Sequence, residues 1–236
     1  ISLQAGPVAI QTTANNGAIT LTGGVSGARD FSATANGTGV ITLGASVTVG
    51  ATAASALGLA AAELSLGNGV VLGTSAVNGD IVLNVDRLTL AGANQVNAGT
   101  GNVSLCPRTT TYTVEFGPSK VLATDVYYDS DFTVFTAGSF TIGAAAHTGA
   151  ITIASSAMTA TYPLSVVNSG AGAVTVAASY SSGGRALSLS SGSGNIHLNG
   201  STINLAGGAF SANSATLLGT ALVLTANGGA SFAGSL

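Results

Sequence analysis

The sequence predicts an all-β fold, a single-stranded β-solenoid of about ten coils with 20 to 24 residues each. Three observations support this prediction. A short motif of glycine followed by alternating apolar and polar residues recurs along the chain. Strand-like segments are separated by Gly, Asn, Ser and Ala, with no long helical pattern between them. The composition is uniform, with 34 glycines and only 6% charged residues, against about 25% in an average soluble domain.

The motif sets the expected coil length. Its copies lie at 17–21, 39–43, 62–66, 79–83, 101–105, 149–153, 172–176 and 194–198. They start 22, 23, 17, 22, 48, 23 and 22 residues apart, so one copy is expected to be hidden in the interval of 48. Second strand-like segments accompany them at 46–49, 87–90, 139–142, 186–189 and 202–205. Alternation with period two is the signature of half-buried strands.

These strands are expected to stack coil on coil, with apolar side chains inside and Thr and Ser outside. One continuous solenoid is predicted over 1–236, with a charged and aromatic loop excursion at about 106–135. A β-sandwich or barrel is the alternative, because its strands also recur at short intervals. Residues 53–66 could instead form a helix, since Ala and Leu favour one.

Charge and hydropathy exclude several classes of function. Five basic residues against eight acidic ones provide no basic stripe for nucleic acid. The most apolar stretch, 51–66, is interrupted by Ser55 and Glu63 and is too short for a membrane-spanning helix, so no membrane insertion is expected. The sequence starts at Ile1 without signal-peptide features, so a processed product or a piece of a longer protein is expected. Cys106 is the single cysteine and is predicted to be a buried thiol, with an intermolecular disulfide as the alternative.

The segments 79–92, 97–105, 136–143 and 149–153 resemble the repeats of filamentous-haemagglutinin-type exoproteins. These are very large bacterial surface proteins, often exported by two-partner secretion, whose bodies are right-handed β-helices. The resemblance implies a right-handed parallel β-helix and a secreted, cell-surface or extracellular location. Arg108 and the Phe116-Gly117 step resemble family features that follow a Val-Ser-Leu strand. The chain departs from the pattern at 109–114 and 120–131.

Charged and aromatic residues gather in the predicted excursion. The candidate contact residues are Tyr112, Tyr127, Tyr128, Asp129 and Asp131, because exposed Tyr beside Asp makes a natural binding patch.

Nearby phenylalanines are expected to serve packing instead of contact. They are Phe132, Phe135 and Phe140.

Three carboxylates, Asp125, Asp129 and Asp131, form a weak candidate for Ca²⁺, which prefers oxygen ligands. The preferred interpretation is that they lie on a solvated loop. No cofactor and no other metal is expected.

Catalysis is not expected. His147 and His197 are isolated from each other and from acidic neighbours, so neither forms a nucleophile–base pair in sequence. The charged residues that lie near the three aspartates in the sequence are Arg108, Glu115 and Lys120, too few for the clustered charges of a carbohydrate-cleaving site.

The function predicted is structural and adhesive: a β-solenoid segment of a large secreted surface protein or extracellular filament. Its partners would be other copies or flanking solenoid segments stacked end to end, because the first and last residues read as ordinary repeat sequence. A host-surface glycan or protein would meet the loop.

One alternative is a carbohydrate-binding or carbohydrate-cleaving β-helix that uses 112–135. A second is ice binding through a Thr face. Its members would be Thr20, Thr42, Thr152 and Thr175, in a column interrupted at Ser65, Val82, Ser104 and His197.

Overall fold

The computed structural model describes residues 1–3, 6–13, 15–27, 29–50, 56–74, 78–93, 95–129, 134–154, 156–219 and 221–236. The chain divides into two compact units. Unit 1 comprises Ile1–Arg108 with Thr133–Ser139, and unit 2 comprises Thr109–Phe132 with Phe140–Leu236. The residues predicted as one excursion are therefore shared between the units. One continuous solenoid over 1–236 stays a prediction.

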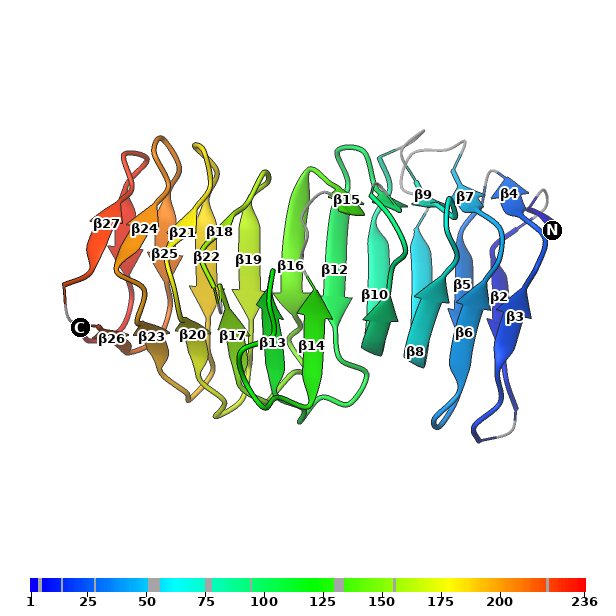
Figure 1. Ribbon diagram of the computed structural model, residues 1–236, viewed down its shortest axis with the longest axis horizontal. Coiled ribbons are helices and arrows are strands. Elements are labelled where there is room, and N and C mark those ends of the chain that lie inside the picture. The colour runs from blue at the N-terminus through cyan, green and yellow to red at the C-terminus, as the bar shows by residue number, and fades with distance from the viewer. Residues whose placement is uncertain are drawn as a thin grey trace. The chain divides into compact units, whose positions relative to one another are not determined.

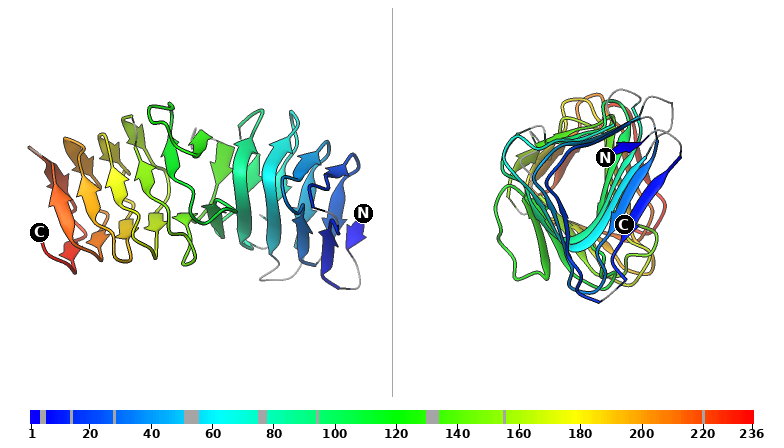
Figure 2. Two further views of the ribbon diagram at one scale, coloured as in Figure 1. Left: turned by 90° about the horizontal axis from the view of Figure 1, so that it is seen from below. Right: turned by 90° about the vertical axis from the view of Figure 1, so that its right-hand side faces the viewer.

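Unit 1 consists of parallel strands on three sides of each coil (Figure 1; Figure 2, right, blue). The first side contains β1 (Ser2–Leu3), β4 (Val25–Gly27), β7 (Val47–Val49), β9 (Leu72–Gly73), β11 (Val96–Asn97) and β15 (Phe135–Thr136). The second contains β2 (Val8–Gln11), β5 (Phe31–Thr34), β8 (Leu57–Leu66), β10 (Ile81–Thr89) and β12 (Asn102–Cys106). The third contains β3 (Ile19–Leu21) and β6 (Val40–Leu43), continued by the second halves of β8 and β10.

Unit 2 repeats this three-sided arrangement. One side contains β16 (Ser139–Gly143), β19 (Leu164–Val167), β22 (Leu187–Ser190), β25 (Phe210–Ala212) and β28 (Ala230–Phe232). The next contains β14 (Val126–Asp129), β13 (Val114–Gly117), β17 (Ile151–Ile153), β20 (Val174–Val176), β23 (Ile196–Leu198) and β26 (Thr216–Leu218). The third contains β18 (Met158–Thr159), β21 (Tyr180–Ser181), β24 (Thr202–Asn204) and β27 (Val223–Thr225).

The predicted fold class is confirmed: both units are β-solenoids, together making about nine turns. The sandwich and barrel alternative is wrong because neighbouring strands are parallel and one full coil apart. The helix alternative for 53–66 is wrong over the described part, where Leu57–Leu66 is strand. Among the residues described, none belongs to a helix long and apolar enough to span a membrane.

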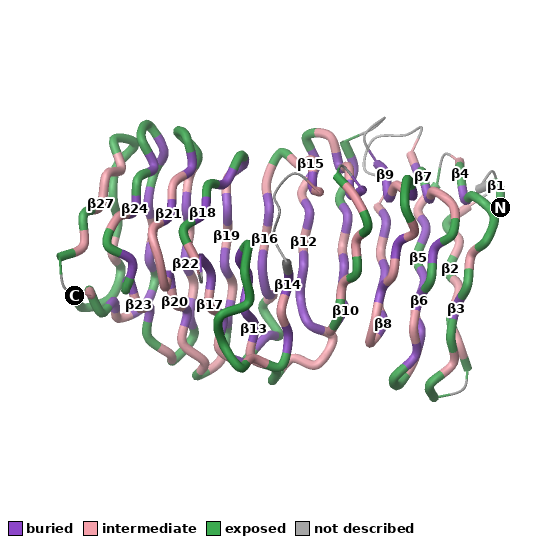
Figure 3. The backbone as a smooth tube through the Cα atoms, in the orientation of Figure 1, coloured by how far each residue is buried: buried purple, intermediate pink, exposed green. Residues whose placement is uncertain are grey.

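Side-chain alternation makes each coil fold. Buried and half-buried residues alternate along β22 (Figure 3). Leu187 and Leu189 therefore point inward, while Ser188 and Ser190 face out. Each buried Leu, Ile, Val or Phe contributes roughly 1.5–3 kcal/mol by leaving water. In unit 2 the column Leu164, Leu187 and Phe210 continues this interior from coil to coil.

The glycine that opens the motif is explained by close backbone approach. A Cβ on Gly194 would collide with the Gly172 carbonyl of the preceding coil, and one on Gly172 would collide with Gly149. The corner before the strand therefore admits no side chain. Residue 62 is Ala, so this requirement is not shared by every copy of the motif.

The sequence indicated that the motif marks the same side of every coil. The structure shows that it does not. Ser65 pairs with Thr42 and Thr89, whereas Val82 pairs with Gly58 and Ser104. The interval of 17 between the copies at 62 and 79 is thus a change of side, not a short coil. The long strands β8 and β10 run through the corner that separates these two sides.

Candidate contact loop

One segment of unit 2 interrupts the regular coils. Residues 109–129, called the contact loop below, contain β13 and β14, which pair with each other in parallel while β13 also pairs with β17. The hidden motif copy is found here, because Val114 and Phe116 align with Ile151 and Ile153. Parallel neighbours usually need a crossover of about a dozen residues or more, but only the segment 118–125 joins these two strands. The segment lies outside them (Figure 2, right, green).

Glu115 holds this segment in place. It occupies an outward position on β13, in register with Thr152, yet its side chain is 0% exposed. One carboxylate oxygen accepts a hydrogen bond from the Val121 backbone N–H (2.6 Å) and the other accepts one from that of Leu122 (3.0 Å). Two charge-assisted hydrogen bonds offset the cost of burying the carboxylate.

Further hydrogen bonds close the base of the segment. The Asp125 carboxylate accepts from the Thr113 N–H and hydroxyl, both at 2.8 Å, and the Asp125 N–H donates to the Thr113 hydroxyl (3.0 Å). These bonds lower the pKa of Asp125 below its ordinary value, because they favour its ionised form. The Tyr127 hydroxyl donates to the Gly117 carbonyl (3.0 Å). The segment is therefore fixed by three side chains, those of Glu115, Asp125 and Tyr127.

The fixed segment displays apolar side chains to solvent. Among the described residues, the exposed large hydrophobics are Ile1, Tyr112, Val121, Leu122, Leu217, Leu218, Val223 and Leu236. Apart from Ile1 and the residues from 217 onward, all of them lie in the contact loop. Val121 is 61% exposed and Leu122 39%.

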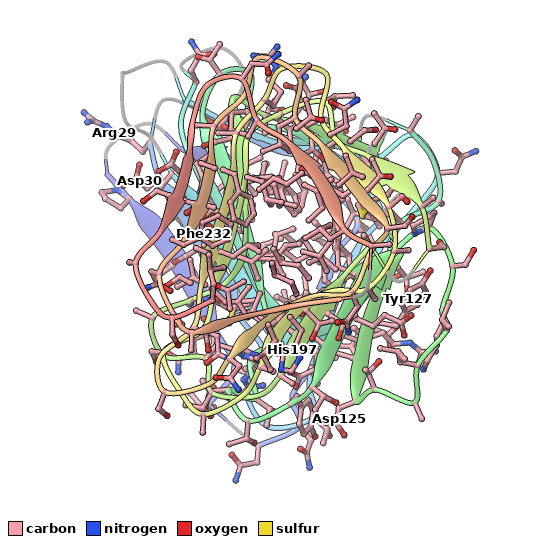
Figure 4. All side chains as sticks on the ribbon, turned by 90° about the vertical axis from the view of Figure 1, so that its left-hand side faces the viewer. Arg29, Asp30, Asp125, Tyr127, His197 and Phe232 are labelled. Carbon is pink, nitrogen blue, oxygen red and sulfur yellow. The ribbon has the colours of Figure 1, made fainter. Side chains whose placement is uncertain are left out.

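The predicted contact residues differ in how far they are exposed. Tyr112 is exposed. Tyr127 is half-buried and also reaches the surface (Figure 4). The prediction that Tyr128 is a contact residue is wrong. Its side chain is only 1% exposed, because it points inward from β14 in register with Phe116. Asp129 ends β14, and its side chain is outside the description. Asp131 lies outside the described residues.

The phenylalanines pack, as predicted, where they are described. Phe140 is buried in unit 2, with ring centroids 5.6 Å from Phe116 and 5.4 Å from Tyr162. Phe135 is buried in unit 1, where it pairs with Val96. Phe132 lies outside the described residues.

The calcium hypothesis stays a prediction. Asp125 lies just before β14 and Asp129 ends it, but the Asp129 side chain and the whole of Asp131 lie outside the description. Among the described residues, no three metal-ligating side chains gather.

The remaining polar candidates serve different purposes. His197 faces outward on β23, as predicted (Figure 4), whereas His147 is completely buried at a corner. Cys106 is a buried free thiol, and burial together with Asp86 raises its pKa to about 11. In unit 1 the Arg108 guanidinium donates to the carbonyls of Ala35 and Gly37 at 2.9 and 2.6 Å.

Sequence reasoning missed Val121, Leu122 and the role of Glu115. The two aliphatics stand in an ordinary polar-rich stretch, and only their exposure distinguishes them. For Glu115 one signal existed: it is an acidic residue at the outward position of a strand whose other residues are apolar.

Comparisons with protein-family models, curated proteins and solved structures found no match for this chain.

Proposed function

We propose that the chain is a structural and adhesive section of a β-solenoid, belonging to a secreted surface protein or extracellular filament. Its coils provide the scaffold, and the contact loop makes the specific contact. The observation behind the proposal is that, within the described part of the chain, the exposed large hydrophobics outside residue 1 and the last coil gather on one loop that a buried carboxylate fixes. The partner proposed is a host-surface protein or its glycans.

The regular faces support the scaffold role. In unit 2 the outward residues Thr141, Ser165, Ser188, Ser211 and Ser231 stand in register on successive coils. Neighbouring hydroxyls bond to each other, as Ser211 does to Ser188 at 3.0 Å. Such a surface is hydrated without charge, and the main-chain ladder below it supplies the stiffness.

The fixed loop supports the contact role. Exposed apolar side chains that are held rigidly before binding lose less conformational entropy when a partner covers them. Val121 and Leu122 fit this description, because Glu115 bonds both of their amides. Tyr112 adds an exposed aromatic ring.

The adhesive part can be tested by solid-phase binding of the chain to extracellular-matrix glycoproteins, native and enzymatically deglycosylated. A Val121→Ser, Leu122→Ser double variant should reduce binding at least tenfold, since two buried aliphatic contacts are lost. A matched Thr152→Ser, Thr175→Ser variant on the regular face should bind like the wild type. Equal loss in both variants, or none in the loop variant, would contradict the proposal. Loss on deglycosylation would identify the glycan as the ligand.

End-to-end stacking is the second part of the proposal. The coil of β26, β27 and β28 exposes Leu218, although it stands at an inward position in register with the buried Leu198, and a further coil would cover it. A second copy provides such a coil in an experiment with the isolated chain. Electron microscopy should show end-to-end fibres that a Leu218→Lys variant abolishes and a Val121→Lys control retains. Short monodisperse particles of the wild type would contradict this part.

Ice binding gains one specific observation. The third side of unit 1 places Thr20, Thr42, Ser65 and Thr89 in one uninterrupted hydroxyl column. Its members are spaced by about 4.8 Å, the strand separation. The Glu63–Arg87 ion pair stands beside the column. Thermal hysteresis that disappears in Thr42→Lys would establish this function, and its absence in the wild type would eliminate it.

A further inference from the structure

His147 is a buried polar side chain without a hydrogen-bond partner. It is 0% exposed, and neither ring nitrogen makes a hydrogen bond of normal geometry within the described part of the chain. Such groups are rare in folded proteins and need an explanation. The next corner shows the contrast: Asn168 is equally buried, yet its side chain bonds the backbone of Gly149, Gly170 and Gly172.

The corner that contains His147 also holds the base of the contact loop. The backbone N–H groups of Thr148 and Gly149 both donate to the Thr110 carbonyl, at 2.8 and 3.2 Å. The Thr148 hydroxyl donates to the same oxygen at 3.3 Å. Gly149 lies so close to the Tyr112 carbonyl that a Cβ would collide with it. Movement of this corner must therefore disturb residues 109–112.

Among the described residues, the segments beside the corner provide no charge that compensates a proton on His147. The segments beside it, 109–113 and 168–173, contain no acidic or basic side chain, and Tyr112 is their one titratable group. On the neighbouring strand β13, the Glu115 carboxylate already accepts the amides of the 118–125 segment. Asp125 is bonded to Thr113. Protonation would thus leave an unpaired charge inside the coil.

Electrostatics agree with this geometry. Burial lowers the pKa of His147, and the Gly149 backbone offsets part of that effect. The Gly149 carbonyl is already an acceptor for Asn168, so a protonated imidazole would have to compete for it or leave the interior. The His147 imidazole consequently binds a proton less readily in the folded corner than in an opened one.

We propose that His147 is an acid-operated release of the contact loop: a proton on its imidazole opens the corner at 144–149 and detaches residues 109–112. The released state is reached at mildly acidic pH, while the coils away from this corner remain stacked. This inference rests on the proposed contact function for its biological meaning, but its physical content is independent of any partner.

The test is amide hydrogen exchange in the chain without a partner, at pH 7.5 and 5.0, corrected for intrinsic exchange rates. In the opened corner, His147 binds a proton with the ordinary histidine pKa, near 6.5. The equilibrium constant for opening should therefore increase by up to tenfold for each pH unit below that value. The Thr148 and Gly149 amides should therefore exchange at least tenfold faster at pH 5.0. In His147→Leu, which has no proton to accept, they should not respond to pH. The matched His197→Leu variant should respond like the wild type.

Two outcomes would overturn the inference: pH-independent exchange of these amides in the wild type, or an unchanged pH response in His147→Leu. If His147→Leu does not fold, an NMR titration of the wild-type imidazole decides the matter. Titration at 6.5 or above, without faster amide exchange, also overturns the inference. Failure of the binding assay would leave these results untouched, so the two proposals can fail separately.

Discussion

Glu115 and Thr175 occupy the same outward column of one sheet in unit 2, joined through Thr152. Thr175 is half-buried on a regular face, whereas Glu115 is covered by the 118–125 segment that its carboxylate binds. The strands below them are alike, since Val114 and Ile151 point into the same interior. The difference shows that one outward residue, followed by a short crossover, converts a coil face into a platform for a loop.

The inward side chains of β13 and β14 should be the most sensitive to substitution. Tyr128→Ala removes a buried ring and should cost about 3–5 kcal/mol of the free energy of unfolding of unit 2. Tyr127→Ala should cost only about 1 kcal/mol, because the half-buried ring loses one hydrogen bond. Urea denaturation of the two variants compares them directly. Equal losses would contradict the assignment of Tyr128 to the interior and Tyr127 to the outside.

Strong acid should weaken the loop before the regular faces. The pKa of Asp125 is lowered by its bonds to Thr113 from an ordinary value of 3.8. Its contribution is therefore present above that value and is lost as the pH falls further through the lowered pKa. Exchange of the Thr113 and Asp125 amides, compared at pH 4.5 and 2.5, should rise in the wild type. Asp125→Asn should show a smaller rise, and the same rise in that variant would contradict this role of the carboxylate.

The regular face should tolerate change. Thr175→Val keeps a β-branched residue on an outward position of β20, so the free energy of unfolding should change by no more than about 0.5 kcal/mol. Thermal or urea unfolding checks it. A loss above about 2 kcal/mol would mean that this face makes contacts as important as those of the loop.

The fold was predictable because it depends on local rules. Alternation at residues such as Leu187, Ser188 and Leu189 predicts a strand, and the recurrence of such strands predicts stacking. The register was less accessible. The spacing of 17 from Ala62 to Gly79 resembles a short coil, and only the long strands β8 and β10 show it to be a change of side.

The site could be predicted as a region but not as residues. Aromatic and acidic side chains marked 109–129, yet the inward position of Tyr128 depends on β14 pairing with β13. Glu115 holds the segment that connects these two strands through its hydrogen bonds to Val121 and Leu122. The exposure of Val121 and Leu122 follows from that pairing.

Hydrogen exchange of the Val121 and Leu122 amides reports whether Glu115 fixes the contact loop. In the wild type these amides should be protected although their side chains are exposed. Glu115→Ala removes both acceptors, at a cost of about 2 kcal/mol or more, so exchange should accelerate at least 30-fold. Glu115→Gln keeps one acceptor oxygen and should show a smaller acceleration. Free-peptide exchange rates for both amides in the wild type would show that Glu115 does not fix the loop.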